Sequence, residues 1–162
     1  MISKRLRRDF IEVIENAKKG KSCYIENTID TKIDMQHFSV LLKGPEKTPY
    51  FGGLWKLDIK IPSDYPFSAP IVKFKTSIYH PNIKEYIDGD HVKDGSICLD
   101  VLSTHWMPSC TIDTVIQTIS ALLGKPNPDD PLSHDIGIEY KDNYELFIKN
   151  ATKYTQKYSI MI

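Results

Sequence analysis

The sequence predicts an α+β fold with an N-terminal helix, a four-stranded antiparallel meander sheet, a long irregular loop and C-terminal helices. Apolar residues recur at helical spacing near both ends of the chain, and between these ends they alternate with polar residues. From residue 75 to residue 110 both periods disappear, and Pro, Gly, Asn, Asp and His are scattered along the chain. Because a loop of this length in a compact domain is uncommon and usually functional, we expect the functional site there.

The first predicted element is a helix. Ser3 can cap it, and it should run to about Lys19, where Gly20 is a stop signal. One stripe of this helix is apolar and should be buried, whereas the rest of its circumference is largely basic. The stripe consists of Leu6, Phe10, Val13, Ile14 and Ala17.

Strand-like segments follow the helix and are separated by turns that contain Gly or Pro. Their ranges are 24–29, which carries the least regular pattern, then 36–42, 55–61 and 71–74. The connections between them are short, so an antiparallel meander is the natural arrangement.

Helical periodicity returns after the irregular loop. Thr111 can cap a helix that Gly124 closes, and the Pro-rich run 126–131 cannot continue it. Asp130 followed by Pro131 looks like the cap and first turn of a short helix. A last helix is predicted from the stripe Tyr144, Phe147, Ala151, Tyr154 and Tyr158.

Length and composition favour a single domain over residues 1–162. The chain carries 21 basic and 21 acidic side chains, and this balance argues against a nucleic-acid partner. No apolar run approaches the ~20 residues of a membrane span, and the charged start does not resemble a signal peptide. Three cysteines without CxxC spacing indicate reduced thiols, so we expect a cytoplasmic and/or nuclear protein. His91 and His105 lack the partner spacing of a zinc site, and no metal is expected.

Cys98 lies within the irregular segment, in the run Gly95-Ser96-Ile97-Cys98-Leu99-Asp100. A free cysteine is most often a small buried hydrophobe. The polar, turn-rich surroundings favour a different interpretation, a reactive thiol that takes an acyl group by attack of its thiolate. A thioester formed in this way is a better acyl donor than an amide, so it conserves energy for a second transfer.

Several further motifs accompany this run along nearly the whole chain. They are Gly44-Pro45, residues 50–53, residues 62–67, Tyr79-His80-Pro81-Asn82, Trp106-Met107-Pro108, residues 126–132 and residues 155–158. Together, and in this order, they resemble the ubiquitin-conjugating enzyme family. The resemblance implies that family's fold and an acyltransferase that accepts ubiquitin as a thioester on Cys98 and passes it to a lysine amine, usually with a ligase. It also implies that the activating enzyme uses the ATP, so no cofactor is expected in this chain.

The resemblance assigns roles to the residues around the cysteine. Asn82 would donate to the oxyanion that forms when the amine attacks, or would mainly prop the loop, and the residues do not separate these two roles. His80 and Pro81 would be structural, since a base beside a thioester would also activate water. Asp130 would orient the lysine amine and receive or relay its proton, and Asp100 matches another acidic position of the family.

The implied partners are ubiquitin, the activating enzyme, a ligase and a protein substrate. The chain itself is expected to be a monomer. Contacts with the activating enzyme and ligase would involve the first helix, although a merely solvated face would show the same charges. Phe67 would be an exposed apolar anchor for ligases unless it packs in the core, and a second ligase-contacting loop would hold Pro108 and Ser109. The implied helix contacts are Lys4, Arg5 and Arg8.

The chain also departs from the family pattern, because Asn82 and Cys98 are farther apart than is usual. The insertion within Lys84–Asp94 reads as a turn-rich surface excursion, either neutral loop growth or an added partner contact. Three other functions stay open: a carrier of another ubiquitin-like modifier, a non-catalytic ubiquitin-binding scaffold of the same fold, and a cysteine hydrolase. Scaffold relatives lack the cysteine, and a hydrolase needs a Cys–His arrangement that the sequence does not show.

Overall fold

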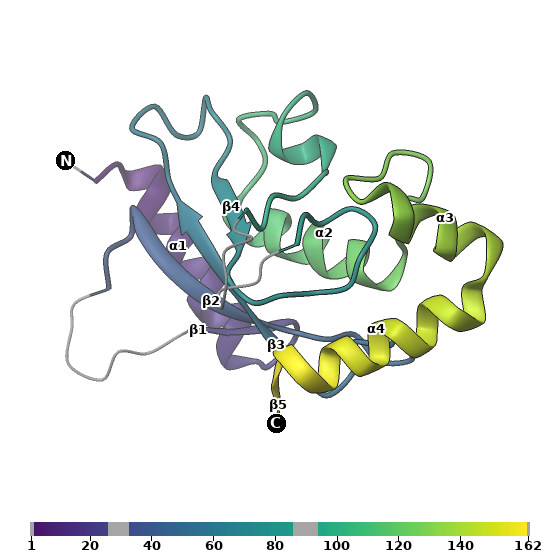
Figure 1. The fold of residues 1–162 in the computed structure, drawn as a ribbon. Helices are drawn as coiled ribbons and strands as arrows, with labels where there is room; N and C mark the ends of the chain where they lie inside the picture. Colours follow the sequence, from purple (N-terminus) through teal and green to yellow (C-terminus); the bar gives the residue numbers. More distant parts are fainter. Residues whose placement is uncertain (1, 26–32, 86–93, 162) are drawn as a thin grey trace.

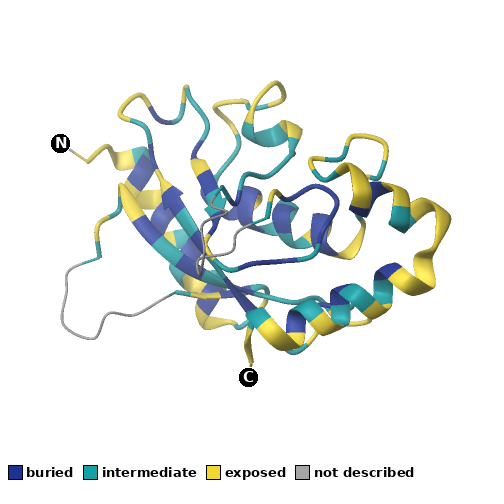
Figure 2. Ribbon diagram, in the orientation of Figure 1, coloured by how far each residue is buried: buried dark blue, intermediate teal, exposed yellow. Residues whose placement is uncertain are grey.

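A computed structural model describes residues 2–25, 33–85 and 94–161 of the chain. In these ranges an N-terminal helix is followed by a sheet, a long loop and three further helices (Figure 1). Helix α1 (Lys4–Lys18) packs against strand β1 and helix α2, and α2 in turn contacts strand β2. The buried residues gather where these elements meet, and the exposed ones follow the loops and outer helix faces (Figure 2). This α+β arrangement confirms the predicted fold class.

Helix α1 begins as the sequence predicts. The Ser3 side chain accepts a hydrogen bond from the backbone N–H of Leu6, and Gly20 follows the helix with a φ of 65°. The apolar stripe is buried apart from the half-buried Ile14, and the Phe10 ring meets Phe38 of the sheet edge to face at 4.9 Å. One charged residue, Asp9, is fully buried on the same helix.

The sheet is an antiparallel meander in the order β1-β2-β3-β4, with a fifth short strand. Its strands are β1 (Cys23–Ile25), β2 (His37–Lys43), β3 (Gly53–Lys60), β4 (Ile71–Phe74) and β5 (Ile160–Met161). The alternating segments were placed correctly, and the register pairs Val40 with Leu57 in the core. The predicted strand at residues 24–29 coincides with β1 only at its start, since residues 26–32 lie outside the described residues.

The predicted four-stranded meander is present, and the described residues add one short strand that was not predicted. Strand β5 pairs Met161 with Gly53 and Ile160 with Leu54, because the chain returns to the start of β3 after the last helix. Gly53 permits this approach, since a Cβ atom there would lie 2.6 Å from the hydroxyl oxygen of Ser159. Two residues are too few to show an alternating pattern, so the sequence gives no signal for this strand.

The C-terminal helices are α2 (Ile112–Gly124), α3 (His134–Asp142) and α4 (Tyr144–Tyr158). Thr111 caps α2 as predicted. The prediction that Asp130 caps the next helix was wrong, because α3 begins only after Ser133 and Asp130 lies in the preceding bend. The predicted stripe of α4 is correct for Phe147 and Ala151, but Tyr144 is exposed at the start of the helix. None of the helices in the described ranges is long and apolar enough to cross a membrane.

The irregular stretch after β4 is anchored to the core by buried aromatic residues. The Trp55 indole N–H donates to the carbonyl of Ser77 at 3.2 Å, and the Tyr50 hydroxyl donates to that of Tyr79 at 2.6 Å. Within the described part of this stretch, residues 75–85 and 94–110, the structure shows one short 3₁₀ helix, Asp100–Leu102, and one isolated bridge. The stretch is thus irregular but firmly held.

Candidate active site

An isolated antiparallel bridge between Ile83 and Ile97 joins the two halves of the irregular loop. The backbone N–H of Cys98 donates to the carbonyl of Asn82 at 2.8 Å, and that of Lys84 donates to Ser96 at 2.9 Å. These bonds place Asn82 beside Cys98. Residues 86–93, which connect the two sides of the bridge in the sequence, lie outside the described residues. The extra length within Lys84–Asp94 therefore leaves the two site residues together.

His80 is fully buried, and both of its ring nitrogens have backbone partners. Nε2 lies 2.9 Å from the carbonyl oxygen of Leu122, and Nδ1 accepts the N–H of Asn82 at 3.0 Å. These contacts require a proton on Nε2 and none on Nδ1. Burial lowers the pKa of His80 to about 4, against the opposing effect of the Leu122 carbonyl. The ring is therefore neutral at physiological pH and is occupied in holding the loop to α2.

The Asn82 side chain is equally committed. Its amide nitrogen donates to the carbonyls of Asn127 and Asp130 at 2.7 and 3.1 Å, and its oxygen accepts the N–H of Asn127 at 2.8 Å. The residue is only 1% exposed. Because both amide hydrogens already have acceptors, Asn82 would have to release one of them to reach an oxyanion. The geometry favours the second of the two predicted roles, in which Asn82 props the loop.

Pro81 supports the same neighbouring segment through its carbonyl group. That oxygen accepts the backbone N–H groups of Leu132 and Ser133 at 2.8 and 3.1 Å. Together with the Asn82 contacts, these bonds fasten the Pro-rich run 126–133 against the cysteine loop. This fastening explains why Asp130 is not a helix cap, since its segment follows the loop instead of starting α3.

Asp130 and Cys98 meet at the surface. The Cys98 thiol lies 3.3 Å from a carboxylate oxygen of Asp130, with Cys98 half-buried and Asp130 exposed. Burial raises the pKa of Cys98 above that of an ordinary thiol, and the hydrogen bond and charge of Asp130 and the charge of Asp100 raise it further. The resting group is thus a protonated thiol that solvent and a partner can reach.

Asp100 is less intimately placed. It begins the 3₁₀ helix, its side chain is 72% exposed, and it lies 3.3 Å from a ring nitrogen of His105. The neighbouring Asp129 forms an ion pair with Lys141 at 2.5 Å. Of the predicted catalytic residues, the structure brings Cys98, Asn82 and Asp130 together and leaves Asp100 at the edge of the site. A search of the described residues finds no group of three or more His, Cys, Asp or Glu that could hold a metal ion.

The geometry of a reachable thiol, a facing carboxylate and a propped loop agrees with the comparisons with known proteins. A family model described as ubiquitin-conjugating enzyme matches residues 5–155. The chain belongs to the ubiquitin-conjugating enzyme family. It is an enzyme of the transferase class that this family represents, acting through a thioester intermediate. Its partners, as for the family generally, are ubiquitin, an activating enzyme and a ligase.

Individual relatives support this assignment. The chain is 44% identical over 134 residues to ubiquitin-conjugating enzyme E2 N of Drosophila melanogaster, which covers 83% of each chain. It is 42% identical to the protein of the same name from Macaca fascicularis, over 77% of each chain. Among solved structures, a Toxoplasma gondii ubiquitin-conjugating E2 domain has a TM-score of 0.79 at 33% identity and covers 96% of this chain and 97% of its own. A structure from Plasmodium yoelii, titled a putative enzyme of this family, has a TM-score of 0.81 at 36% identity and covers 100% and 99%.

The residues predicted to contact partners of this ubiquitin-conjugating enzyme differ in exposure. Phe67 is 77% exposed, which excludes core packing, and Pro108 and Ser109 are exposed as well. The Phe67 loop and Trp106 line a groove of about 530 Å³ that extends to Ile97, next to Cys98. On α1, Lys4 and Arg8 are exposed, whereas Arg5 is half-buried and bound within the molecule. Arg5 is thus committed to contacts inside the molecule.

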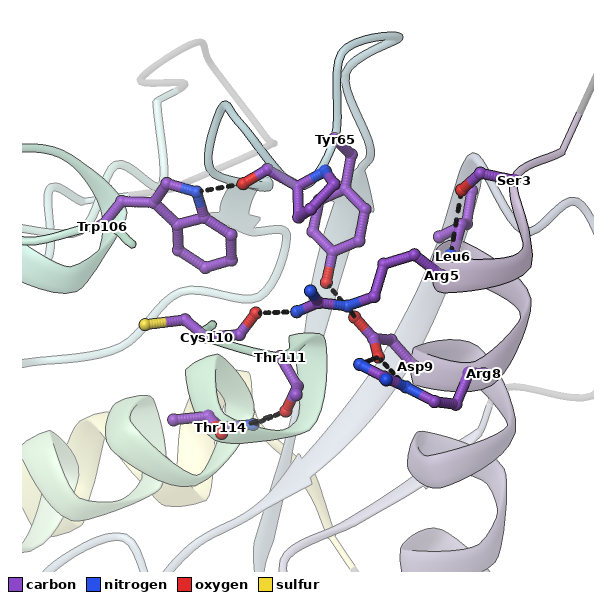
Figure 3. A network of polar contacts seen from close by, with 11 residues as sticks. Ser3, Arg5, Leu6, Arg8, Asp9, Tyr65, Trp106, Cys110, Thr111 and Thr114 are labelled. Atoms are coloured by element: carbon purple, nitrogen blue, oxygen red, sulfur yellow. Dashed lines mark hydrogen bonds and ion pairs between the residues drawn. The ribbon is translucent and has the colours of Figure 1, made fainter. Parts of the chain in front are cut away.

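The sequence interpretation missed a buried polar network in the N-terminal half of α1. The Asp9 carboxylate accepts hydrogen bonds from Arg5 and from the Tyr65 hydroxyl, each at 2.5 Å (Figure 3). Arg5 also donates to the carbonyl of Cys110 at 2.7 Å. A signal was present, because Asp9 falls on the apolar stripe one position before Phe10, where an exposed charge is not expected.

Proposed function

We propose that Cys98 is the residue that carries ubiquitin and that Asp130 assists its transfer to a lysine amine. The observation that carries this proposal is the 3.3 Å contact between a reachable thiol and a carboxylate at the surface. The chemistry needs such a thiol, because the sulfur must take an acyl group from one partner and present it to another. It also needs a sulfur without a free imidazole base that would activate water against the thioester, and His80 is buried, neutral and fully bonded.

The first step is exchange of one thioester for another. The Cys98 thiolate attacks the carbonyl carbon of the ubiquitin thioester on the activating enzyme, a new C–S bond forms, and the thiolate of the activating enzyme leaves. Because the pKa of Cys98 is raised, only a small fraction of the thiol is ionised at neutral pH. The small thiolate fraction lowers the reactivity of the free enzyme but does not block the exchange. The leaving thiolate of the activating enzyme takes up the proton that Cys98 releases.

The second step is attack of lysine on the Cys98 thioester. The thiol proton is then gone, so the Asp130 carboxylate no longer has a donor on sulfur and is free to accept a hydrogen bond from the incoming ammonium group. The amine must lose a proton from an ordinary pKa of ~10.4, and a carboxylate at the site can receive or relay it. The C–N bond forms, the C–S bond breaks and Cys98 leaves as a thiolate.

Asn82 contributes by position in this scheme. Its amide group holds the backbone carbonyl of Asp130 at 3.1 Å, so it fixes the carboxylate beside the sulfur. The His80 ring holds the backbone of Asn82, and the Pro81 carbonyl holds the backbone of Leu132 and Ser133. The chain supplies these groups itself, and the ATP is consumed by the activating enzyme, so we propose no cofactor for this protein.

One assay tests the proposal. The protein is incubated with activating enzyme, ATP and either ubiquitin or another ubiquitin-like modifier, and the products are separated on gels with and without reductant. We expect an adduct of ubiquitin that reductant cleaves, a reductant-resistant ester with Cys98→Ser, and no adduct with Cys98→Ala. Cys110→Ala is the matched control, and it should charge like the wild type.

The alternatives give different results in the same assay. A preferred adduct with another modifier would replace ubiquitin as the cargo, and an adduct that survives Cys98→Ala would remove Cys98 as the carrier. Binding of ubiquitin without any covalent adduct would indicate the non-catalytic scaffold. Release of free modifier from a charged species faster than its transfer to lysine would indicate a hydrolase.

A further inference from the structure

The buried carboxylate of Asp9 joins α1 to the loop that holds Tyr65, two segments that are far apart in the sequence. It is 0% exposed, and it receives hydrogen bonds from Arg5 and Arg8 of its own helix and from Tyr65 of the loop that precedes Phe67. Burial, together with the hydrogen bond to Asp9, raises the pKa of Tyr65 well above its usual value, so the hydroxyl stays protonated and donates. One oxygen of Asp9 thus binds both a guanidinium and a phenol.

The contacts of Asp9 continue into the loop that carries Pro108 and Ser109. Arg5 donates from its second guanidinium nitrogen to the carbonyl of Cys110 at 2.7 Å, directly before the cap of α2. Trp106, at the other end of this loop, donates its indole N–H to the carbonyl of Pro66 at 2.8 Å. The links close a ring through Arg5, Asp9, Tyr65, Pro66, Trp106 and Cys110, which we call the Asp9 network (Figure 3).

The residues on the outside of this network are the exposed ones. Phe67 follows Pro66 directly, and Met107, Pro108 and Ser109 lie between Trp106 and Cys110. Phe67 and Met107 are 77% and 59% exposed, so neither is fixed by core packing of its own. The relative placement of the two loops, and of both loops against α1, is therefore set by the polar contacts beneath them together with the packing of the Tyr65 and Trp106 rings.

We propose that Asp9 is a positioning residue that assembles α1, the Phe67 loop and the Pro108 loop into one docking surface for the activating enzyme. This inference rests on the proposed function, because the activating enzyme must dock on the protein to pass ubiquitin to Cys98. Asp9 itself does not touch the reacting atoms, and Cys98 and Asp130 belong to a different set of contacts. Loss of the Asp9 charge should therefore weaken the association with the activating enzyme while leaving the chemistry at sulfur intact.

The test separates association from chemistry. Thioester formation on Asp9→Asn is measured with activating enzyme, ubiquitin and ATP at increasing concentrations of the variant, and discharge of the purified thioester onto free lysine is measured separately. We expect the half-saturating concentration to rise about three- to tenfold, the effect of losing one charge-assisted contact that couples the segments, with the maximal charging rate and the lysine discharge unchanged.

Two further variants make the test specific. Tyr65→Phe removes only the hydroxyl and keeps the Arg5–Asp9 pair, so it should fold and show a smaller rise in the same quantity. The double variant should be no worse than Asp9→Asn alone, since both act through one contact. Asp113→Asn is the control, because Asp113 is another buried carboxylate, on α2, and one of its oxygens has no hydrogen-bond partner among the described residues.

The outcomes are distinguishable from failure of the proposed function. If the wild type takes no ubiquitin, the proposed function is wrong and the inference falls with it. If the wild type charges but Asp9→Asn, Tyr65→Phe and Asp113→Asn all keep the wild-type half-saturating concentration, only the inference is wrong. Equal losses in maximal charging rate and lysine discharge would also overturn it, because they would indicate damage to the whole fold.

Discussion

At the scale of single residues, the site places the Asp130 carboxylate against the Cys98 thiol, while the His80 ring is fully bonded to backbone groups and cannot act as a base on the sulfur. Asp130 stabilises the protonated form of Cys98, because a negative charge and a hydrogen-bond acceptor beside the sulfur oppose formation of the thiolate. The same carboxylate is proposed to help the amine in the second step. A residue that slows one reaction of the sulfur and speeds the other can be tested with two separate measurements.

Asp130→Asn should raise the reactivity of the free thiol and lower the transfer to lysine. Without the charge the pKa of Cys98 falls toward its ordinary value, so alkylation by iodoacetamide at pH 7.5 should be faster, by about threefold. Discharge of the ubiquitin thioester onto free lysine should fall roughly 100-fold, the lower end of the ~10²–10⁴-fold range for loss of a group that assists proton transfer. The backbone carbonyl that Asn82 holds remains in this variant, so the loop is kept.

Asp129→Asn is the matched control for Asp130. Asp129 is the neighbouring exposed acid, but it pairs with Lys141 and is absent from the groups that shift the pKa of Cys98. Its alkylation and discharge rates should match those of the wild type. Alkylation of Asp130→Asn at the wild-type rate would show that this carboxylate does not control the thiol.

At the scale of elements, the cysteine loop depends on one turn where it meets the sheet. Gly95 has a φ of 66°, its carbonyl accepts the N–H of Phe74 at the end of β4, and a Cβ atom there would lie 1.9 Å from the carbonyl oxygen of Phe74. Next to it, Asp94 forms a hydrogen bond with Ser96 and ion pairs with Lys84 and Lys73, and the bond from Ser96 together with Lys84 lowers the pKa of Asp94 to about 2. This turn fixes the end of the insertion before the chain reaches Cys98.

Gly95→Ala should therefore disturb both stability and the site. The clash is with backbone atoms, which cannot move aside as a flexible side chain could, so we expect a loss of about 3 kcal/mol in the free energy of unfolding. Urea denaturation measures this loss, and the rate of thioester formation should fall with it.

Gly124→Ala provides the contrast. Gly124 is the last residue of α2, and a Cβ atom there would meet nothing within 4 Å. Its substitution should leave stability unchanged or improve it by up to about 1 kcal/mol, because alanine favours the helix. Equal effects of the two substitutions would contradict the role given to the Gly95 turn.

At the scale of the whole molecule, His80 links the functional loop to the core helix. Its ring bridges the Leu122 carbonyl of α2 and the Asn82 N–H, and burial lowers its pKa to about 4 from an ordinary value of 6.5. The folded protein thus excludes a proton that the unfolded chain binds below pH 6.5. The stability associated with the neutral ring is complete above pH 6.5 and decreases as the pH falls toward 4.

The free energy of unfolding should accordingly decrease by on the order of 3 kcal/mol between pH 6.5 and pH 4 through this one group. His80→Gln cannot titrate there, so its stability should change less over the same range even though it is lower at pH 7. Urea midpoints at pH 7, 5.5 and 4.5 for both proteins make the comparison. Parallel curves for the wild type and the variant would show that His80 is not the responsible group.

The sequence allowed accurate prediction where local chemistry decides the outcome. The cap at Ser3, the alternating strands and the helix after Thr111 follow from propensity and periodicity, and the structure has them in place. The position of Cys98 beside Asn82 and Asp130 was predicted from the family motifs, not from local pattern. Asp130 was misassigned as a helix cap because its segment is held by Pro81 and Asn82, which are distant in the chain.

The sequence by itself determined the fold class, the family and the thiol, because periodicity and motifs are written in consecutive residues. Only the tertiary structure decided that Asn82 is occupied by the loop it supports, that Arg5 is turned inward, and that Asp9 lies beneath the exposed loops. Each of these depends on hydrogen-bond partners that are dozens of positions apart in the chain. A donor can be satisfied by any acceptor that folding brings near it, so the choice of partner is a property of the packed chain and not of the local sequence.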